Sequence, residues 1–242
     1  MVNVEQLLSD AVQHFWRTRS MQHERQGSVT GVKDAGNRAA VTGGKHADGF
    51  VRLVAEVVAD AGIDNFNIHT AEKRKRTIPG YYRAAKEWDL VVAMNRTLVA
   101  AVEVKSQVGS FGNNFNSRVE EAIGNASDFW TAYAKGVYEG SARPWLGYFF
   151  MLEEHPNSLS PSRQLDLSPF KVEPAFQGLS YALRYEEVCK RLVRERLYDA
   201  ACFITSNSRD GAKGQYSEPA AEIGVKNVAR SLHAHVAAIA AV

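Results

Sequence analysis

The sequence predicts an α/β fold in which a central β-sheet is flanked by helices. Short apolar runs typical of strands alternate with segments of helical periodicity along most of the chain. The expected strands are residues 66–70, 90–94, 98–102, 145–152 and 198–205. The expected helices are residues 3–26, 50–61, 117–135, 181–196 and 221–241. With 242 residues, the chain is expected to form one domain, 1–242, with a sizeable core.

The first third of the chain contains two expected helices and a polar, glycine-rich stretch between them, residues 27–49. Gly44-Lys45 invites a phosphate-loop interpretation, but Ala39 replaces the earlier glycine and His46 replaces the hydroxyl residue that such a loop needs. The stretch is either a loop that orders against DNA or a surface loop. In the helix that follows, Glu56 lies off the apolar stripe, where it could reach a metal site or face solvent.

Composition and charge are those of an ordinary globular protein. The formal net charge is only +2, so an interaction with nucleic acid has to rest on local patches. Cys189 and Cys202 are far apart in apolar surroundings and are expected to be reduced core residues. Acidic residues interrupt the start of the chain, and the apolar tail is too short to cross a bilayer. We expect a soluble, cytoplasmic protein with no membrane association.

Residues 88–105, WDLVVAMNRTLVAAVEVK, predict a β-hairpin that carries charged side chains at its open end. Two apolar runs flank the short polar stretch 95–97, which suits a three-residue hairpin loop. A turn centred on Arg96 would place Asp89 opposite Glu103. Side chains alternate along a strand, so Lys105 would share a face with Glu103.

Two carboxylates and a lysine in this arrangement suit the metal-dependent hydrolysis of a phosphodiester. Asp89 and Glu103 would bind Mg²⁺, and the backbone carbonyl of Val104 would add a third oxygen ligand. Lys105 would orient or deprotonate the attacking water and offset developing negative charge. The alternative is a cross-strand salt bridge at the end of a sheet. Spacing alone leaves both interpretations open, because D-x(n)-E-x-K is short and recurs by chance.

Basic and amide side chains near the hairpin are candidates for DNA contact. They lie in the glycine-rich stretch, in the segment 73–86, in an amide-rich loop expected after the hairpin, and in the loop 206–215. The candidates are Lys45, Arg74, Arg76, Arg83, Gln107, Asn113, Asn114, Asn116, Arg118, Arg209 and Lys213. The alternative is that these charges are solvated and that the asparagines form turns. Glu120 and Glu121 receive no role from the sequence.

Asp89…Glu103-Val104-Lys105, bracketed by helices and followed by further strands, resembles the core of the PD-(D/E)XK nucleases. Longer stretches resemble the XhoI family of type II restriction endonucleases: HFWRTR, GNRAAVTGGKHADGF, WDLVV, EVKSQ with FGNNFNSRVEEA, RPWLGYFF and YDAACFIT. The family implies a bacterial homodimer that uses Mg²⁺ to cut duplex DNA at CTCGAG, leaving 5′ overhangs, with a cognate DNA methyltransferase as partner. Trp88 stands where the motif often has proline.

Two other functions are compatible with the same residues. The chain could be a nuclease with this core and another task on DNA, such as repair or junction resolution. It could also be a non-catalytic, sequence-specific DNA-binding protein in which the charges of the hairpin only pair with one another.

Overall fold

The computed structural model describes residues 2–30, 46–164 and 166–241, with side chains between 22 and 30 left aside. Within that part, a five-stranded mixed sheet has the order β1-β4-β5-β6-β7. The strands are β1 Ile68–His69, β4 Leu90–Met94, β5 Thr97–Gln107, β6 Trp145–Glu153 and β7 Ala200–Ser206. The pairs β1·β4 and β4·β5 are antiparallel, whereas β5·β6 and β6·β7 are parallel. The predicted mixed sheet flanked by helices is confirmed.

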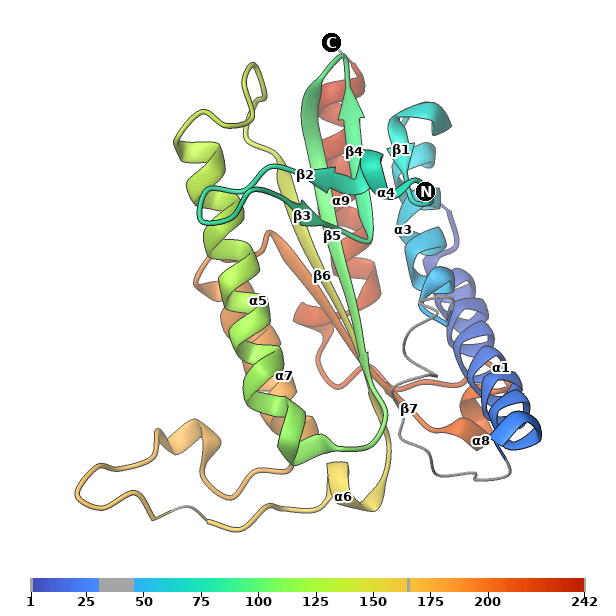
Figure 1. Cartoon of the computed structure of the whole chain (residues 1–242), viewed down its shortest axis with the longest axis vertical. Helices are drawn as coiled ribbons and strands as arrows, with labels where there is room; N and C mark the ends of the chain where they lie inside the picture. Colours follow the sequence, from blue (N-terminus) through green and yellow to red (C-terminus); the bar gives the residue numbers. More distant parts are fainter. Residues whose placement is uncertain (1, 31–45, 165, 242) are drawn as a thin grey trace.

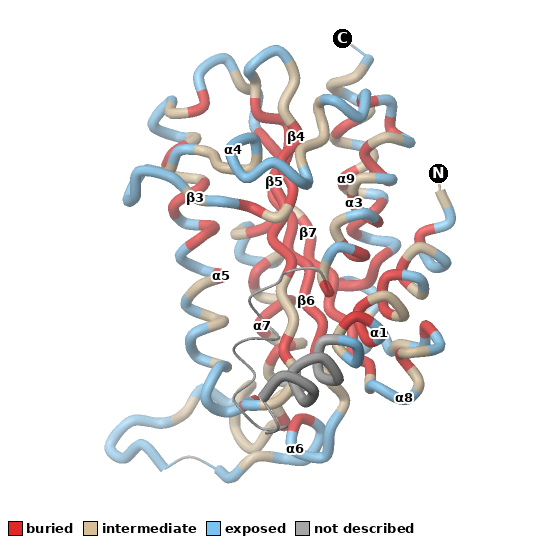
Figure 2. The backbone as a smooth tube through the Cα atoms, turned by 45° about the vertical axis from the view of Figure 1, so that its right-hand side comes forward, coloured by how far each residue is buried: buried red, intermediate tan, exposed pale blue. Residues whose placement is uncertain are grey.

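Helices cover both faces of this sheet (Figure 1). One face packs against α1 Val4–Thr30, α3 Asp48–Asp60 and α9 Val225–Ala240, and the other packs against α5 Phe111–Ala134 and α7 Tyr181–Arg194. Because the parallel strands are covered on both sides, β6 and β7 are almost continuously apolar and buried (Figure 2). The sheet therefore separates two hydrophobic cores.

Shorter elements connect these layers. They are η1 Asn65–Asn67, α4 Lys73–Arg76, β2 Thr77–Ile78, β3 Lys86–Glu87, α6 Pro156–Leu159, η2 Pro174–Phe176, α8 Ser208–Gly211 and η3 Ala221–Ile223. β2 and β3 form a separate two-stranded sheet. Among the described helices, none combines the length and the apolar character needed to cross a bilayer.

The β4–β5 turn differs from the predicted three-residue loop. Its two central residues, Asn95 and Arg96, have φ of 47° and 70°, the conformation of the two-residue turns whose twist matches that of a hairpin. The register then shifts by one, because Val92 pairs with Ala100 while Ala93 pairs with Leu98. The bulge compensates for the shorter turn.

Two other predicted boundaries were wrong. The amide-rich stretch expected as a loop before residue 117 forms the first turns of α5, because Phe111 is buried and Phe115 packs against Tyr185. This packing overrides the low helix propensity of glycine and asparagine. The glycine-rich stretch 27–49 is helical up to Thr30 and again from Asp48. Lys45 lies outside the described residues.

Candidate active site

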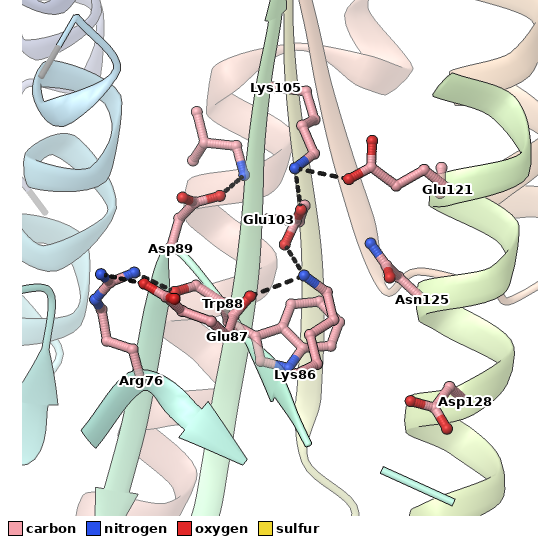
Figure 3. A network of polar contacts seen from close by, with 12 residues as sticks. Arg76, Lys86, Glu87, Trp88, Asp89, Glu103, Lys105, Glu121, Asn125 and Asp128 are labelled. Atoms are coloured by element: carbon pink, nitrogen blue, oxygen red, sulfur yellow. Dashed lines mark hydrogen bonds and ion pairs between the residues drawn. The ribbon is translucent and has the colours of Figure 1, made fainter. Parts of the chain in front are cut away.

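The carboxylates and the lysine predicted from the hairpin meet on the face of the sheet that α5 covers (Figure 3). Leu90 pairs with Val102, and the N–H of Asp89 donates to the carbonyl of Val102 at 3.1 Å. The N–H of Val104 donates in turn to Asp89 Oδ2 at 2.7 Å. Asp89 therefore lies opposite Glu103, as the sequence predicts, although the turn that produces this pairing differs.

The carboxylate of Glu103 is held between two lysines. Lys105 Nζ pairs with its Oε1, and Lys86 Nζ lies 2.8 Å from its Oε2. Lys86 also donates to the carbonyl of Glu87 at 2.9 Å and lies over the ring of Trp88, 4.5 Å from its centroid. The side chain of Glu103 is only 2% exposed, so both contacts occur away from bulk solvent. Paired in this way, a buried carboxylate is stable only while its cations remain.

Lys105 has a second carboxylate partner on α5. Its Nζ lies 3.0 Å from Glu121 Oε1, and Arg118 Nη1 lies 2.9 Å from the other oxygen of Glu121. Burial by itself would lower the pKa of Lys105, but the charges of Glu103 and Glu121 raise it above its ordinary value. Lys105 is therefore an ammonium in this arrangement, which suits hydrogen-bond donation and charge stabilisation better than proton abstraction.

The surroundings of Asp89 disfavour its charged form, whereas those of Lys105 favour the charged ammonium. Burial, followed by repulsion from Glu103, raises the pKa of Asp89 to about 6. The N–H of Val104 and the nearby lysines only partly offset these effects. A buried carboxyl with a raised pKa is typical of a functional site. Bringing a divalent cation between Asp89 and Glu103 would relieve this repulsion.

The residues present fit a hard divalent cation such as Mg²⁺. Two carboxylates and a backbone carbonyl offer oxygen ligands, which such an ion prefers, and water completes its coordination. In a strand, the N–H and C=O of one residue point to the same edge, so the carbonyl of Val104 faces the edge where Asp89 lies. Within the described ranges, no metal site is formed by three or more histidine, cysteine, aspartate or glutamate side chains. An ion at this site would therefore have two carboxylate ligands from the protein.

Comparison with known proteins gives the family. The sequence profile described as "Restriction endonuclease XhoI" matches residues 25–218. The chain belongs to the XhoI family of restriction endonucleases. Enzymes of this family are type II site-specific deoxyribonucleases. No solved structure matches the chain.

Three curated relatives of this XhoI-family chain are type II restriction enzymes. The type II restriction enzyme BstVI of Geobacillus stearothermophilus is 46% identical over 215 residues, which cover 86% of this chain and 95% of the relative. The type II restriction enzyme XhoI of Xanthomonas vasicola is 38% identical over 195 residues, which cover 80% of this chain and 77% of the relative. The type II restriction enzyme AbrI of Azospirillum brasilense is 42% identical over 188 residues, which cover 74% of this chain and 82% of the relative.

Four polar residues on one face of α5 frame the site of this XhoI-family chain. They are Arg118, Glu121, Asn125 and Asp128, three or four residues apart, and Figure 3 shows the last three along the helix. Glu121 holds Lys105, whereas Asn125 and Asp128 hold Arg83. No role was predicted for Glu121 or Asp128, and Lys86 belongs to the segment 73–86 that was predicted to contact DNA. The spacing of three or four residues, which places these polar side chains on one helix face, was the signal available.

Three of the arginines predicted to contact DNA lie around the carboxylates. Arg76 pairs with Glu87 at 2.7 Å and donates to the carbonyl of Trp88, which fixes the strand leading to Asp89. Arg83 and Arg118 belong to the α5 contacts described above. Arg74 is exposed on α4.

The amide residues after the hairpin have two different environments. Gln107 is buried, and its amide nitrogen donates to the carbonyls of Gly109 and Ser110 at 3.3 and 3.2 Å while Tyr185 Oη donates to its oxygen. Its polar atoms are thus used within the protein. The three asparagines are exposed on the first turns of α5, at Asn113, Asn114 and Asn116.

The remaining candidates lie across the sheet from α5. Arg209 and Lys213 are exposed in and beside α8, which packs against α1 through Gly211 and Trp16. The structure therefore does not bring them to the carboxylates. Glu56 is exposed on α3, also on the opposite face, which favours the solvent-facing alternative for it.

Proposed function

We propose that the chain is a type II restriction endonuclease that hydrolyses duplex DNA at CTCGAG and leaves 5′ overhangs, using Mg²⁺ on a PD-(D/E)XK core. The observation that carries the proposal is the convergence of Asp89, Glu103 and Lys105 under α5. A mixed sheet with an antiparallel hairpin, a crossover helix and a parallel strand supports the core assignment. The restriction enzymes among its relatives support the activity.

Asp89, Glu103 and the carbonyl of Val104 would hold the ion, which supplies a water of lowered pKa and offsets charge on the phosphate. Lys105, kept protonated by its carboxylate partners, donates a hydrogen bond to the attacking water or to a phosphate oxygen. Glu121 keeps that ammonium directed toward the carboxylates. Burial of Glu103 limits competition from bulk water.

Contacts to the duplex are proposed for polar residues around the site that are exposed or partly exposed. Asn113, Asn114 and Asn116 would face base edges or phosphates, and Arg74, Arg83 and Arg118 would contact the backbone. Arg76 acts on the strand before Asp89 rather than on DNA, and the buried Gln107 is left out. Arg209 and Lys213 would contact DNA only if the duplex extended around the molecule to the opposite face of the sheet. The proposed DNA contact of Lys45 is retained.

A palindromic target implies a homodimer, because two-fold symmetry presents one identical active site to each strand. A cognate methyltransferase would be needed in the same bacterial cytoplasm, since an unprotected genome would be cut. Both follow from the proposed activity.

The decisive experiment is a digest of a plasmid that carries one CTCGAG site, with a control plasmid that differs at one base of the site. Sequencing of the fragment ends reports activity, site and stagger together. Asp89→Asn, Glu103→Gln and Lys105→Met should each lower cleavage by at least about 100-fold. Glu120→Gln, at an exposed neighbour of Glu121, is the matched control and should cut normally.

Other outcomes would refute the proposal. Preferential cutting of branched DNA would indicate a repair or junction nuclease on the same core. Sequence-specific binding in EDTA, with no cleavage after addition of any divalent ion, would indicate a DNA-binding protein without activity. If the three variants also lost all duplex binding, their role would be structural rather than catalytic.

A further inference from the structure

A short hairpin beside the active site carries two exposed tyrosines. We call residues 77–87 the arm: β2 pairs with β3, with Thr77 opposite Glu87, and a loop joins them. In Figure 1 the arm crosses in front of β4 and β5, and its tip reaches α5. The arm is continuous with the active site, because Lys86 of β3 contacts Glu103.

Asp128 of α5 fixes the tip of the arm. The N–H groups of Tyr81 and Tyr82 both donate to its Oδ1 at 2.8 Å, and Arg83 Nε donates to its Oδ2 at 2.8 Å. The side chain of Asp128 is only 7% exposed. Asn125 accepts a further hydrogen bond from Arg83 Nη2 at 2.8 Å. Charge-assisted hydrogen bonds at a buried carboxylate are among the strong ones in proteins.

The backbone of the tip also sits close to its supports. A Cβ atom on Gly80 would lie 2.5 Å from Asp128 Oδ2 and 2.9 Å from the carbonyl oxygen of Arg83, so this position requires glycine. Tyr138 Oη donates to the carbonyl of Pro79 at 3.1 Å. The conformation of the tip is thus set before any ligand binds, which reduces the entropy lost on binding.

The tip presents aromatic surface to solvent. Tyr81 is 48% exposed and Tyr82 is 70% exposed, and their rings meet edge to face at 5.1 Å. Tyrosine offers a large apolar ring and a polar hydroxyl, which makes it common at interfaces. Two such rings, exposed on a backbone that a buried carboxylate holds in place, indicate a contact surface rather than part of a core.

Basic residues in and directly before the arm point to a polyanion as the partner. The segment 73–86 contains six basic residues and no acidic one. It leads directly to Asp89, where the phosphate to be cut would lie. A duplex bound at the carboxylates would therefore extend across the arm. Phosphates would meet the basic side chains of segment 73–86, and sugars and base edges would meet the two tyrosine rings.

We propose that Tyr81 and Tyr82 contact duplex DNA beside the phosphate that is cut, and that Asp128 and Asn125 are positioning residues that hold the arm for this contact. The proposal rests on the proposed function and names residues to which that function assigns no role. The same face of α5 then serves both purposes: Glu121 holds Lys105, and Asp128 holds the arm.

Fluorescence anisotropy of a labelled CTCGAG duplex tests the proposal, with Ca²⁺ in place of Mg²⁺ and a gel to verify that the duplex is intact. The double variant Tyr81→Ala/Tyr82→Ala should bind at least about tenfold more weakly, given the worth of aromatic contacts to nucleotides. The double Tyr→Phe variant should fall between this variant and the wild type. Phe66→Ala removes another exposed ring, 74% accessible, outside the arm and should bind within about twofold of wild type.

Asp128→Asn separates positioning from contact. It should weaken binding although both rings are retained, and adding it to the double alanine variant should cause little further loss. If circular dichroism shows that Asp128→Asn is unfolded, the tyrosine variants carry the test alone. Double-alanine binding within twofold of wild type would overturn the inference, while normal plasmid cleavage by wild type would leave the proposed function intact. A wild type that neither binds nor cuts the duplex would overturn both.

Discussion

Lys86 offers a direct thermodynamic test for an ion at Glu103. Lys86→Met removes the ammonium that lies 2.8 Å from Glu103 Oε2 while keeping an apolar side chain over Trp88. Lys86 and Glu103 are only 11% and 2% exposed. Without a divalent ion, the variant leaves a buried carboxylate with Lys105 as its remaining lysine partner. With a divalent ion bound, the positive charge of the ion compensates the Glu103 carboxylate in place of the missing ammonium.

The expected loss of stability in Lys86→Met follows from the burial of the ion pair. Removing one partner of a buried ion pair typically costs about 3–5 kcal/mol. The remaining contact to Lys105 places this case at about 3 kcal/mol, which for a chain of this size lowers the thermal midpoint by about 6–12 °C. With the ion bound, the loss should fall to about 1 kcal/mol. By linkage, the variant then binds the ion about 30-fold more tightly than wild type, since the difference of about 2 kcal/mol must appear in the affinity.

Calorimetric unfolding in EDTA and in excess Mg²⁺, combined with titration of the ion, measures both quantities. The control is Lys73→Met, which removes the same charge from a side chain that is 79% exposed and 3.2 Å from Glu87. That variant should shift stability by less than about 0.5 kcal/mol in either buffer. Equal destabilisation of the Lys86 variant with and without Mg²⁺, or no stabilisation of wild type by Mg²⁺, would refute the reasoning.

Three further predictions concern other parts of the structure. Gly147→Ala places a Cβ 2.3 Å from the buried ring of Trp145, so calorimetry should show a loss of about 2–3 kcal/mol, and an unchanged midpoint would contradict this packing. Burial lowers the pKa of His46 to about 4, so stability should fall by about 2–3 kcal/mol as pH drops from about 6.5 to 4, and His46→Leu should flatten that slope in urea titrations. Glu121→Gln should reduce cleavage by about 10-fold, less than Lys105→Met, and a loss as large as that of the lysine variant would give Glu121 a direct catalytic role.

The pairing of Asp89 with Glu103 was predictable from the symmetry of a hairpin about its turn. A turn centred on Arg96 places Asp89 and Glu103 at equal distances along the chain from its centre. The local path was not predictable, because a two-residue turn with a bulge and a three-residue turn give the same pairing at the open end. The two runs, 90–94 and 98–102, are continuously apolar, so their sequences do not show where the extra residue lies.

The contact between Asp128 and Arg83 and the start of α5 were not predicted, because both depend on contacts between residues far apart in the sequence. Asp128 lies 45 residues from Arg83, and the contact between them depends on how the arm crosses the sheet. The start of α5 depends on Phe115 meeting Tyr185, which belongs to a helix much later in the chain. Local propensity predicted a loop there, and tertiary packing decided otherwise.

The position of the site follows from the unequal lengths of its two strands. β5 runs from Thr97 to Gln107, whereas β4 begins only at Leu90, opposite Val102. Beyond that pair, the edge of β5 has no β4 residue to continue the ladder, and the side chain of Asp89 accepts the hydrogen bond of Val104 instead. An edge of this kind exposes backbone oxygen beside carboxylate oxygen, while the opposite edge of β5 stays paired with β6. The same geometry that ends the antiparallel ladder therefore assembles the proposed ligands.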